Sequence, residues 1–417
     1  MKEFLAKKSL FFHLLLLRLG VDLFPNSIES SAGNELGQTE TSEFTERKIL
    51  IVGMSESPHL HTWVEGIADS KITSKIWLFP SDLPLRKLKN SKIKIIQFPY
   101  LIIGLPTKLV FRILDVLTGR LWRSYFLFYE INRIKPTHLH FHETQHSAYI
   151  YNSIAKHPKN QFAGKIILST WGSDLIAYGK IENHLPKIRQ VMSWVGLLTA
   201  ERSVDEQIAI ANGFTGKFLA PIYITIGNRN LSCDLKKPSE RSIVVVKGYQ
   251  DAHGRALNAL ASIELLAHQM ELTNFRFKVF SASKSVKKKS KQLRKRLGIN
   301  IDVLRRMPKT KLMAYFGEAR AYLGLALSDG LSTSMVEAMS YGAFPIQSEN
   351  SAAPEFLVNK VTGGVVDPED IQEVSNLLRM ALLDDELVDQ AALSNAELLK
   401  IKYNWETGVT QMAEIYE

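Results

Sequence analysis

The alternation of short apolar runs with helix-length segments constrains this chain most, and it occurs in two separate series. The first series begins at Arg47 and the second at Arg241. Apolar runs of this length are typical of strands buried on both faces of a parallel sheet. Strands that alternate with helices indicate an α/β fold with doubly wound parallel sheets. We expect strands at residues 48–53, 76–79, 93–98, 138–141 and 165–169, and then at 242–247, 275–280, 321–327 and 343–346.

The length of 417 residues suits two such domains. The stretch 227–238, which is rich in Asn, Ser and Lys, suits a connection between them. We therefore predict an N-terminal domain at residues 47–228 and a C-terminal domain at 239–400. A last segment, 401–417, follows the second domain.

The first 46 residues differ from the rest. The apolar stretch 10–17 is flanked by Arg18 and Asp22, so it is shorter than the roughly 18 uninterrupted apolar residues that span a bilayer. We interpret residues 1–25 as an amphipathic interfacial helix, with a signal peptide as the alternative. Residues 26–46 are polar and are predicted to be a disordered linker.

The formal charge of +10 favours an anionic partner. Between Lys284 and Arg296 the chain has eight basic residues and no acid, which fits a solvated helix face or attraction to anionic lipid. No aromatic residue is interleaved there, so nucleic acid is not the expected partner. A smaller basic cluster lies at 86–94. The single cysteine, Cys233, excludes an internal disulfide and a cysteine-ligated zinc site.

Residues 328–346 carry the most informative pattern. A strand is followed by Asp329, by the turn residue Gly330 and then by hydroxyl residues that open a helix. The free amides at a helix start attract anions, so a diphosphate would fit here, flanked by the carboxylates of Asp329 and Glu337. The alternative is a capping box in which Glu337 only returns to the Ser334 amide.

This pattern resembles the C-terminal domains of the family 4 glycosyltransferases, in which an acidic residue is followed eight positions later by a glutamate. The resemblance implies the GT-B fold of two facing Rossmann-like domains, with a donor domain at 239–400 and an acceptor domain at 47–228. It also implies that the final segment, 401–417, is a helix crossing back to the N-terminal domain. The matching residues are Asp329, Glu337, Ala338, Met339 and Gly342, together with 353–355 and 362–364.

The same resemblance implies roles for the donor site. Asp329 would bind hydroxyls of the donor hexose, the backbone of Gly330, Leu331, Ser332 and Thr333 would hold the diphosphate, and Glu337 would bind the ribose. The family also uses two cations to neutralise the leaving diphosphate.

Lys247 and Arg255 are the candidates for this cationic pair, and ordinary surface cations are the alternative. Charge grows on the leaving group as the glycosidic bond breaks, so cations placed there would favour the transition state. No divalent metal is expected, because the sequence has no pair of carboxylates bracketing one residue of the metal-binding kind and the cations Lys247 and Arg255 could take its place. No cofactor is expected either, since the nucleotide diphosphate sugar is a co-substrate.

The ends of three expected strands supply candidates for the N-terminal wall of the cleft. The segment 140–143 resembles the family's H-x-H-[DE] element, which implies that the second histidine approaches the reacting sugar. A structural histidine and a simple helix N-cap are the alternatives at these positions. The candidates are Gly53, His59 and His61 after the first strand, His140 and His142 after a second, and Gly172 and Asp174 after a third.

These observations together predict a retaining glycosyltransferase that moves a hexose from a nucleotide diphosphate sugar to a hydroxyl of a saccharide or lipid-linked acceptor, in envelope polysaccharide or glycolipid synthesis. His142 and Asp329 would serve catalysis. We expect a cytoplasmic enzyme attached peripherally to the anionic inner face of a membrane. The alternatives are a nucleotide-sugar 2-epimerase of the same fold and a catalytically silent donor-binding protein.

Overall fold

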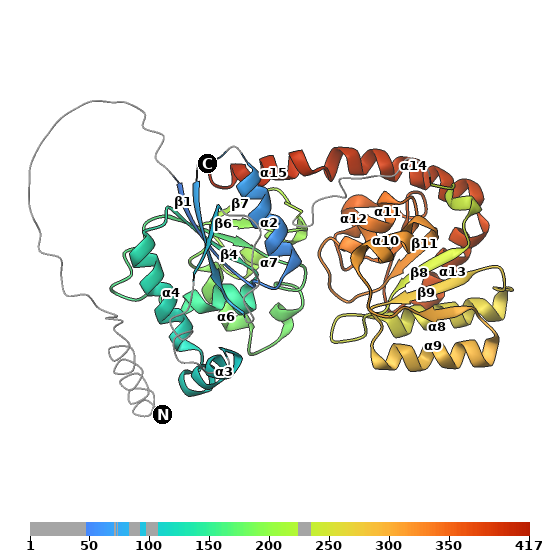
Figure 1. Cartoon of the computed structure of the whole chain (residues 1–417), viewed down its shortest axis with the longest axis horizontal. Coiled ribbons are helices and arrows are strands. Elements are labelled where there is room, and N and C mark those ends of the chain that lie inside the picture. The colour runs from blue at the N-terminus through green and yellow to red at the C-terminus, as the bar shows by residue number, and fades with distance from the viewer. Residues whose placement is uncertain (1–46, 71, 73, 83–91, 97–106, 224–234) are drawn as a thin grey trace, which may run out of the picture.

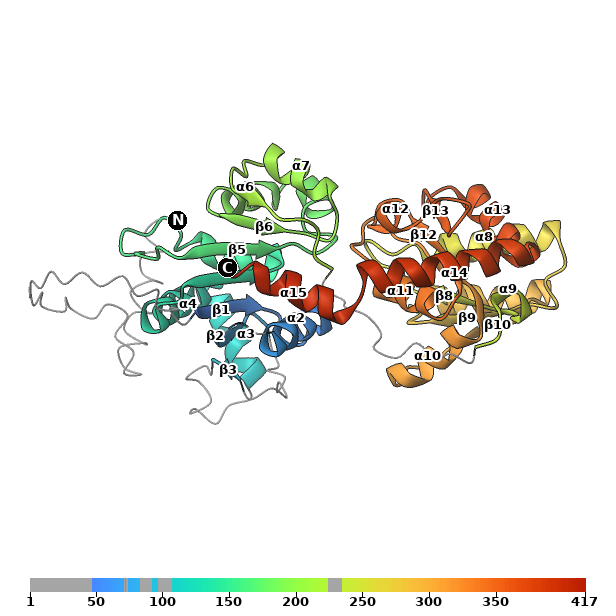
Figure 2. The ribbon, with the colours of Figure 1, turned by 90° about the horizontal axis from the view of Figure 1, so that it is seen from above.

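A computed structural model describes residues 47–417 except 71, 73, 83–91, 97–106 and 224–234. The chain folds into two α/β domains that lie side by side along the long axis of the molecule (Figures 1 and 2). All strand pairings in both sheets are parallel, as the buried apolar runs predict.

The N-terminal sheet has seven strands in the order β3-β2-β1-β4-β5-β6-β7. Central β1 is buried along most of its length, which explains why its sequence is apolar without alternation. The strands are β1 (Arg47–Gly53), β2 (Ser74–Pro80), β3 (Ile93–Ile95), β4 (His138–His142), β5 (Lys165–Ser169), β6 (Leu197–Thr199) and β7 (Lys217–Phe218).

The C-terminal sheet has six strands in the order β10-β9-β8-β11-β12-β13. The order reverses at β8 and β11, and in open α/β sheets ligands bind beside such a switch point, outside the carboxyl ends of the strands. The strands are β8 (Ile243–Lys247), β9 (Arg276–Phe280), β10 (Ile301–Val303), β11 (Ala319–Gly324), β12 (Phe344–Ser348) and β13 (Gly364–Val366).

Helices cover both faces of each sheet. In the N-terminal domain one face packs against α4 (Leu121–Ile134), α5 (Tyr149–Asn152), α6 (Leu185–Met192) and α7 (Val204–Ala211), and the other against α2 (Pro58–Asp69). Helix α3 (Thr107–Thr118) precedes α4. In the C-terminal domain the helices are α8 (Ala256–Gln269), α9 (Lys284–Leu297) and α13 (Ile371–Leu383) on one face, and α10 (Lys309–Gly317), α11 (Thr333–Ser340) and α12 (Ala353–Phe356) on the other.

The last two helices join the domains. Helix α14 (Asp385–Lys402) packs on the C-terminal domain, and α15 (Trp405–Glu414) lies beside α2 of the N-terminal domain (Figure 2). Met412, Ile415 and Tyr416 enter the core beneath β1, against Trp63. The end of the described chain is thus part of the first domain's core.

Several expectations need adjustment. The expected strand 321–327 ends at Gly324, and the next residues form the loop that carries Asp329. The short strands β6, β7, β10 and β13 were not predicted, because two or three residues carry too little pattern. Some predictions concern segments outside the described residues. These segments are 1–25, 26–46, much of the basic cluster 86–94 and much of the connection 227–238. Among the described residues, no helix combines the length and the apolar character needed to cross a membrane.

Candidate active site

A cavity of about 470 Å³ lies between the two domains. Its walls come from the loops after β1, β4, β5 and β6 of one sheet and after β8, β9 and β11 of the other. The carboxyl ends of parallel strands meet at the same edge of a sheet, and here the two edges face each other. The fold therefore brings the predicted C-terminal motif opposite loops of the N-terminal domain.

The C-terminal wall centres on an ion pair between Lys247 and Asp329. Lys247 Nζ lies 2.9 Å from Asp329 Oδ2 and donates to Ser332 Oγ at 3.3 Å. Burial alone would lower the pKa of Lys247, but the Asp329 carboxylate outweighs this and raises it. Lys247 is therefore a permanent cation at the mouth of the bend, as the sequence predicts for one member of the pair.

Arg255 lies elsewhere. It caps the start of α8, and its Nε lies 2.6 Å from Glu369 Oε1. It is not among the residues that line the cavity. The expected pair of cations at the diphosphate is therefore reduced to Lys247 in this structure, because the long loop before α8 turns Arg255 toward Glu369.

The bend from Gly330 to Ser334 presents backbone donors to the cavity. Ser332 is the N-cap of α11 and its side chain does not cap the helix. Within the described residues, the N–H groups of Ser332, Thr333 and Ser334 have no hydrogen-bond partner. Free amides at a helix start form a ready anion site, so the expected binding element is present.

Glu337 lines the same cavity from α11. Its Oε1 lies 2.5 Å from Lys309 Nζ, and the carboxylate does not return to the Ser334 amide. The capping-box alternative is thus wrong. Burial raises the pKa of Glu337, while Lys309 acts in the opposite direction.

The N-terminal wall includes His59 and Trp171, whose ring centroids are 5.3 Å apart. Burial lowers the pKa of His59, with Asp329 raising it and Lys247 lowering it across the cavity. Gly172 touches the opposite bend, since a Cβ on Gly172 would lie 1.8 Å from the Gly330 nitrogen. Ser328 Oγ donates to Gly172 O at 3.0 Å, so the two domains are in direct contact here.

The predicted histidines of β4 do not line the cavity. Their rings do lie on the same side of the strand, with centroids 4.3 Å apart, but both are fully buried. His140 is held by Tyr416 Oη at 2.6 Å and Ser169 Oγ at 2.8 Å, which is a structural role. His142 packs against Trp63, neither of its ring nitrogens has a hydrogen-bond partner among the described residues, and burial lowers its pKa to about 3.

Two other predicted residues also support the wall from behind. A Cβ on Gly53 would meet the Leu60 side chain at 2.8 Å, so this glycine permits close packing of α2. His61 Nε2 lies 2.7 Å from Ser55 O, which braces the loop after β1.

Asp174 organises the loops of the N-terminal wall. Its Oδ2 accepts from the N–H groups of Thr144 and Trp171, each at 3.0 Å, and so ties the loop after β4 to the loop after β5. Burial and the nearby Glu143 raise the pKa of Asp174. The N-cap alternative is wrong for Asp174 because its side chain joins two loops.

Sequence reasoning missed Glu201, which follows β6 and reaches across to the bend. Its Oε2 accepts from the Leu331 N–H at 3.1 Å, so in this structure the Glu201 side chain already satisfies that amide. A second bridge joins Ser203 N and Oγ to Glu355 Oε1 at 2.8 and 3.0 Å. The strand-end rule that located the other candidates would have found Glu201, had the three-residue β6 been recognised.

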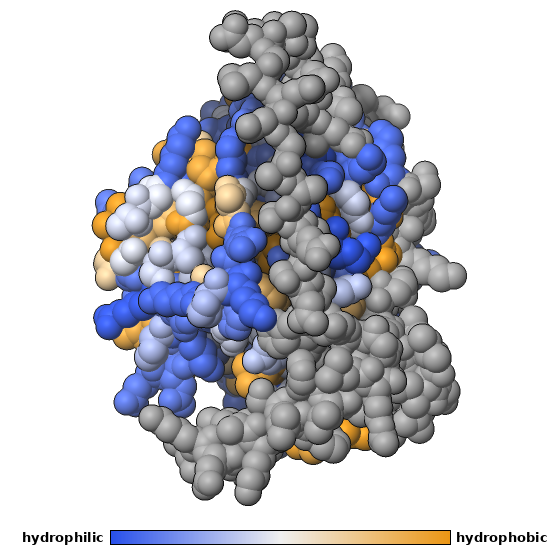
Figure 3. Space-filling model, turned by 90° about the vertical axis from the view of Figure 1, so that its left-hand side faces the viewer, coloured by the Kyte–Doolittle hydropathy of each residue, from blue (hydrophilic) through white to orange (hydrophobic). Residues whose placement is uncertain are grey.

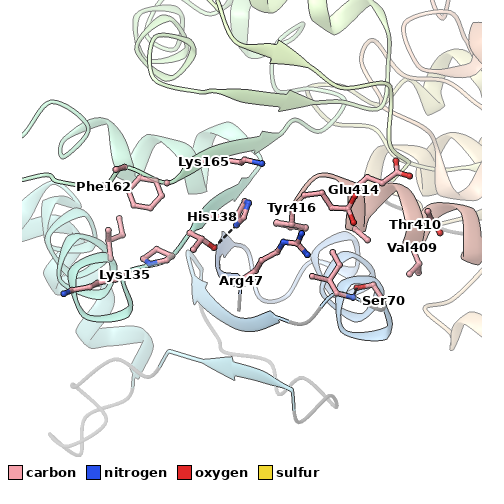
Figure 4. Close-up of a pocket in the computed structure, with 18 of the residues that line it drawn as sticks. Arg47, Ser70, Lys135, His138, Phe162, Lys165, Val409, Thr410, Glu414 and Tyr416 are labelled. Atoms are coloured by element: carbon pink, nitrogen blue, oxygen red, sulfur yellow. Dashed lines mark hydrogen bonds between the residues drawn. The ribbon is translucent and has the colours of Figure 1, made fainter. Parts of the chain in front are cut away.

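A larger hollow of about 1680 Å³ lies at the opposite edge of the N-terminal sheet (Figure 4). Arg47, Lys135, His138 and Lys165 come from the amino ends of strands and their flanking loops, and Tyr416 comes from the C-terminal end (Figure 4). It is remote from the carboxyl strand ends, where α/β folds bind ligands. We therefore assign the candidate active site to the smaller cavity between the domains. Among the described residues, no cluster of His, Cys, Asp and Glu side chains is arranged to hold a metal ion.

Comparison with known protein families gives a match that lies largely in the C-terminal domain. Residues 230–396 match the family model described as "Glycosyl transferases group 1", and this range contains Lys247, Asp329 and Glu337. The chain is a glycosyltransferase. No curated protein sequence matches it.

The solved structures that resemble this glycosyltransferase share its two-domain GT-B fold. Sucrose-phosphate synthase from Thermosynechococcus elongatus aligns with a TM-score of 0.65 at 14% identity, covering 89% of this chain and 98% of that chain. A trehalose-6-phosphate protein from E. coli, solved with UDP-2-fluoro glucose, aligns with a TM-score of 0.66 at 13% identity over 88% and 98% of the two chains. A lipopolysaccharide outer core galactosyltransferase aligns at 0.63 and 13% identity over 89% and 100%. At these identities the likeness confirms the predicted fold.

Proposed function

We propose that this protein is a retaining glycosyltransferase of family 4 type that transfers a hexose from a nucleotide diphosphate sugar to a hydroxyl group of a saccharide or lipid-linked acceptor. One observation carries the proposal. The amides of Ser332, Thr333 and Ser334 are unpartnered among the described residues, and these three residues line a cavity that is also lined by Lys247. Free amides beside a partly buried cation suit a diphosphate.

The flanking carboxylates suit the two sugars of such a donor. Asp329 comes before the bend and is 28% exposed at its side chain, so it can accept from hexose hydroxyls while it holds Lys247. Glu337 is one helical turn beyond the bend and can accept from the ribose. Burial is the larger effect and raises the pKa of Glu337, and Lys309, which now pairs with this carboxyl, partly opposes it.

In this proposal the chemistry depends on the leaving diphosphate. The bond between the anomeric carbon and the phosphate oxygen breaks, and the acceptor hydroxyl attacks from the same face while the departing phosphate takes its proton. Lys247 and the amides stabilise the charge that develops on the phosphate. His142, which is behind the wall and against Trp63, would act as a positioning residue.

We further propose that the enzyme acts at a membrane surface. The N-terminal domain exposes the apolar residues Ile113, Val116, Leu117 and Leu121 on α3 and at the start of α4, with Arg120 exposed among them. The face in Figure 3 has hydrophilic side chains with small apolar patches between them, where described atoms are visible. This mixture suits peripheral attachment through charge and a few apolar contacts.

The donor is tested first with a thermal-shift panel of UDP-, GDP-, ADP- and dTDP-hexoses. A specific ligand at a hundredfold excess over its Kd stabilises the fold by about 2.7 kcal/mol. One nucleotide class should raise the melting temperature of the wild type and leave that of Glu337→Ala unchanged. If no nucleotide sugar raises the melting temperature of the wild type, the proposal that the cavity binds such a donor is wrong.

Attachment to membranes is tested by flotation with vesicles that contain anionic lipid. We expect the intact chain to float at low salt and to be released at high salt, because surface charge interactions are screened. A protein that stays with the soluble fraction at every salt concentration would contradict this part of the proposal.

Two other functions remain as alternatives within this fold. A 2-epimerase would convert the donor with no acceptor present, so a nucleotide sugar incubated alone with the enzyme and recovered unchanged argues against it. A silent donor-binding protein would bind the donor yet release no nucleoside diphosphate with any acceptor. Release of nucleoside diphosphate that Glu337→Ala abolishes argues for catalysis.

A further inference from the structure

Glu201 holds an unusual position in the cleft. It follows β6 of the N-terminal domain, and its Oε2 accepts the Leu331 N–H of the C-terminal bend at 3.1 Å. It lines the same cavity as Lys247 and Asp329. A Cβ on Gly330 would lie 1.8 Å from Glu201 Oε2, so the bend leaves room for this carboxyl only because residue 330 is glycine.

The second oxygen of the carboxyl has no partner. Glu201 is 95% buried, and Oε1 is enclosed without a hydrogen bond among the described residues. A buried polar atom without a partner costs on the order of 1–3 kcal/mol, more when it is charged. An atom of this kind at the wall of a ligand cavity is a position where a bound molecule can supply the missing hydrogen bond.

The surroundings keep this carboxyl neutral. Burial and the nearby Asp329 raise the pKa of Glu201 to about 8, against smaller effects from the Leu331 N–H and Arg202. The neutral acid accepts from Leu331 through one oxygen and has an O–H left to donate through the other. The titratable and charged groups around it are Asp329 and Lys247 on the C-terminal wall, Arg202 and Asp205 on its own loop and helix, and Tyr223 and Glu355.

We propose that Glu201 is a specificity-determining residue of the donor site, and that its free Oε1–H donates a hydrogen bond to an oxygen of the donor hexose. The proposal rests on the proposed donor binding. It assigns Glu201 to the hexose because the carboxyl lies at Gly330 and Leu331, on the Asp329 side of the bend, whereas the free amides for the diphosphate are at Ser332 to Ser334.

A neutral acid suits this place. Asp329 already supplies one negative charge and the donor diphosphate brings more, so a second ionised carboxylate would oppose the donor. A sugar that covers Glu201 also removes its remaining access to water, which favours the protonated form further. Deprotonation above pH of about 8 should therefore weaken the contact with the hexose.

The test compares the affinity of a nucleotide sugar with that of its nucleoside diphosphate, using UDP-glucose with UDP and GDP-mannose with GDP, by titration calorimetry at pH 6.5 and 9. In the wild type, we expect the sugar to add affinity at pH 6.5 and to add at least threefold less at pH 9. Glu201→Gln keeps a neutral donor and acceptor, so its sugar advantage should persist at both pH values. Glu201→Ala should lose about tenfold in affinity for the nucleotide sugar and little for the nucleoside diphosphate.

The outcomes separate the possible roles. If Glu201→Ala weakens both ligands equally, Glu201 only holds the domains together and the proposal is overturned. It is also overturned if Glu201→Gln shows the same pH dependence as the wild type.

Glu397→Gln, which changes an exposed glutamate of α14, serves as the control and should match the wild type. If neither nucleotide nor nucleotide sugar binds any variant at pH 6.5, the proposed function fails and not only the role of Glu201. A thermal melting curve of each variant without ligand checks that the variant is folded.

Discussion

The two walls of the cleft are built in different ways. The C-terminal wall takes its chemistry from a single strand end and one continuous bend, where Lys247, Asp329 and the residues with free amides at the start of α11 line the cavity. The N-terminal wall is assembled from four separate loops, and the two β4 histidines expected to serve it, His140 and His142, are buried behind it. The residues of a wall formed by one turn can be predicted from local sequence. Those of a wall formed by several loops depend on how the whole domain packs.

The first prediction concerns how the buried histidines change the stability of the N-terminal domain at acidic pH. His138, His140 and His142 are neutral in the fold, since burial lowers their pKa values, to about 4 for His138 and about 3 for His142. An unfolded histidine has a pKa of about 6.5, so unfolding takes up protons as pH falls below that value. Each of these histidines therefore contributes a loss of stability of up to about 1.4 kcal/mol per pH unit as the pH falls below that value, whereas the raised pKa values of Asp174 and Glu201 act in the opposite direction.

Tryptophan fluorescence can follow this domain alone. All six tryptophans lie in the N-terminal domain or in α15. In chemical unfolding followed by this signal, the stability of His142→Phe relative to the wild type should be higher at pH 5 than at pH 7, because the variant has one buried neutral histidine fewer. The same pH dependence in the wild type and in His142→Phe would contradict a contribution of this histidine to acid stability.

The largest effect on activity is expected at the C-terminal wall. Lys247→Ala removes the cation that faces the developing phosphate charge, and the loss of one such group costs about 100- to 1000-fold in kcat. Steady-state kinetics with the donor identified by thermal shift would measure it. Lys400→Ala, an exposed lysine of α14, is the control. A loss below tenfold in Lys247→Ala would mean that the bend alone stabilises the leaving group.

Tyr416→Phe tests the support behind the N-terminal wall. The Tyr416 hydroxyl accepts from Trp63 Nε1 at 3.0 Å and so donates to His140 Nδ1 at 2.6 Å. Its removal leaves two buried groups unpaired, and we expect about 2 kcal/mol of destabilisation in urea with kcat nearly unchanged. Tyr129→Phe, which removes no hydrogen bond seen among the described residues, should leave stability unchanged. A large fall in kcat at full stability would instead assign His140 to catalysis.

Gly172→Ala tests the contact between the walls. An added Cβ would lie 1.8 Å from the Gly330 nitrogen, so the domains would have to separate to accept it. We expect about tenfold lower kcat/KM with each domain still folded, since a tenfold change corresponds to about 1.4 kcal/mol. Small-angle scattering should show a larger radius of gyration. Gly179→Ala, where nothing lies within 4 Å of the new Cβ, should behave as wild type.

The sequence was sufficient for the fold and for the C-terminal wall because both depend on local pattern. The long buried strands of both sheets were predicted within a few residues, and Asp329, Gly330 and Glu337 line the cavity as expected. The pairing of Arg255 with Glu369 joins residues 114 apart, which no local pattern reveals. Glu201 was missed for a similar reason, because the amide that it binds lies 130 residues further along the chain.

The hydrogen bond between Trp63 and Tyr416 spans 353 residues. During synthesis, the first domain can form its sheet early, but the layer beneath β1 stays open until α15 and Tyr416 have left the ribosome. The second domain is then already complete. A nascent chain of this protein thus keeps the apolar surface that Met412, Ile415 and Tyr416 later cover exposed for nearly the whole of translation.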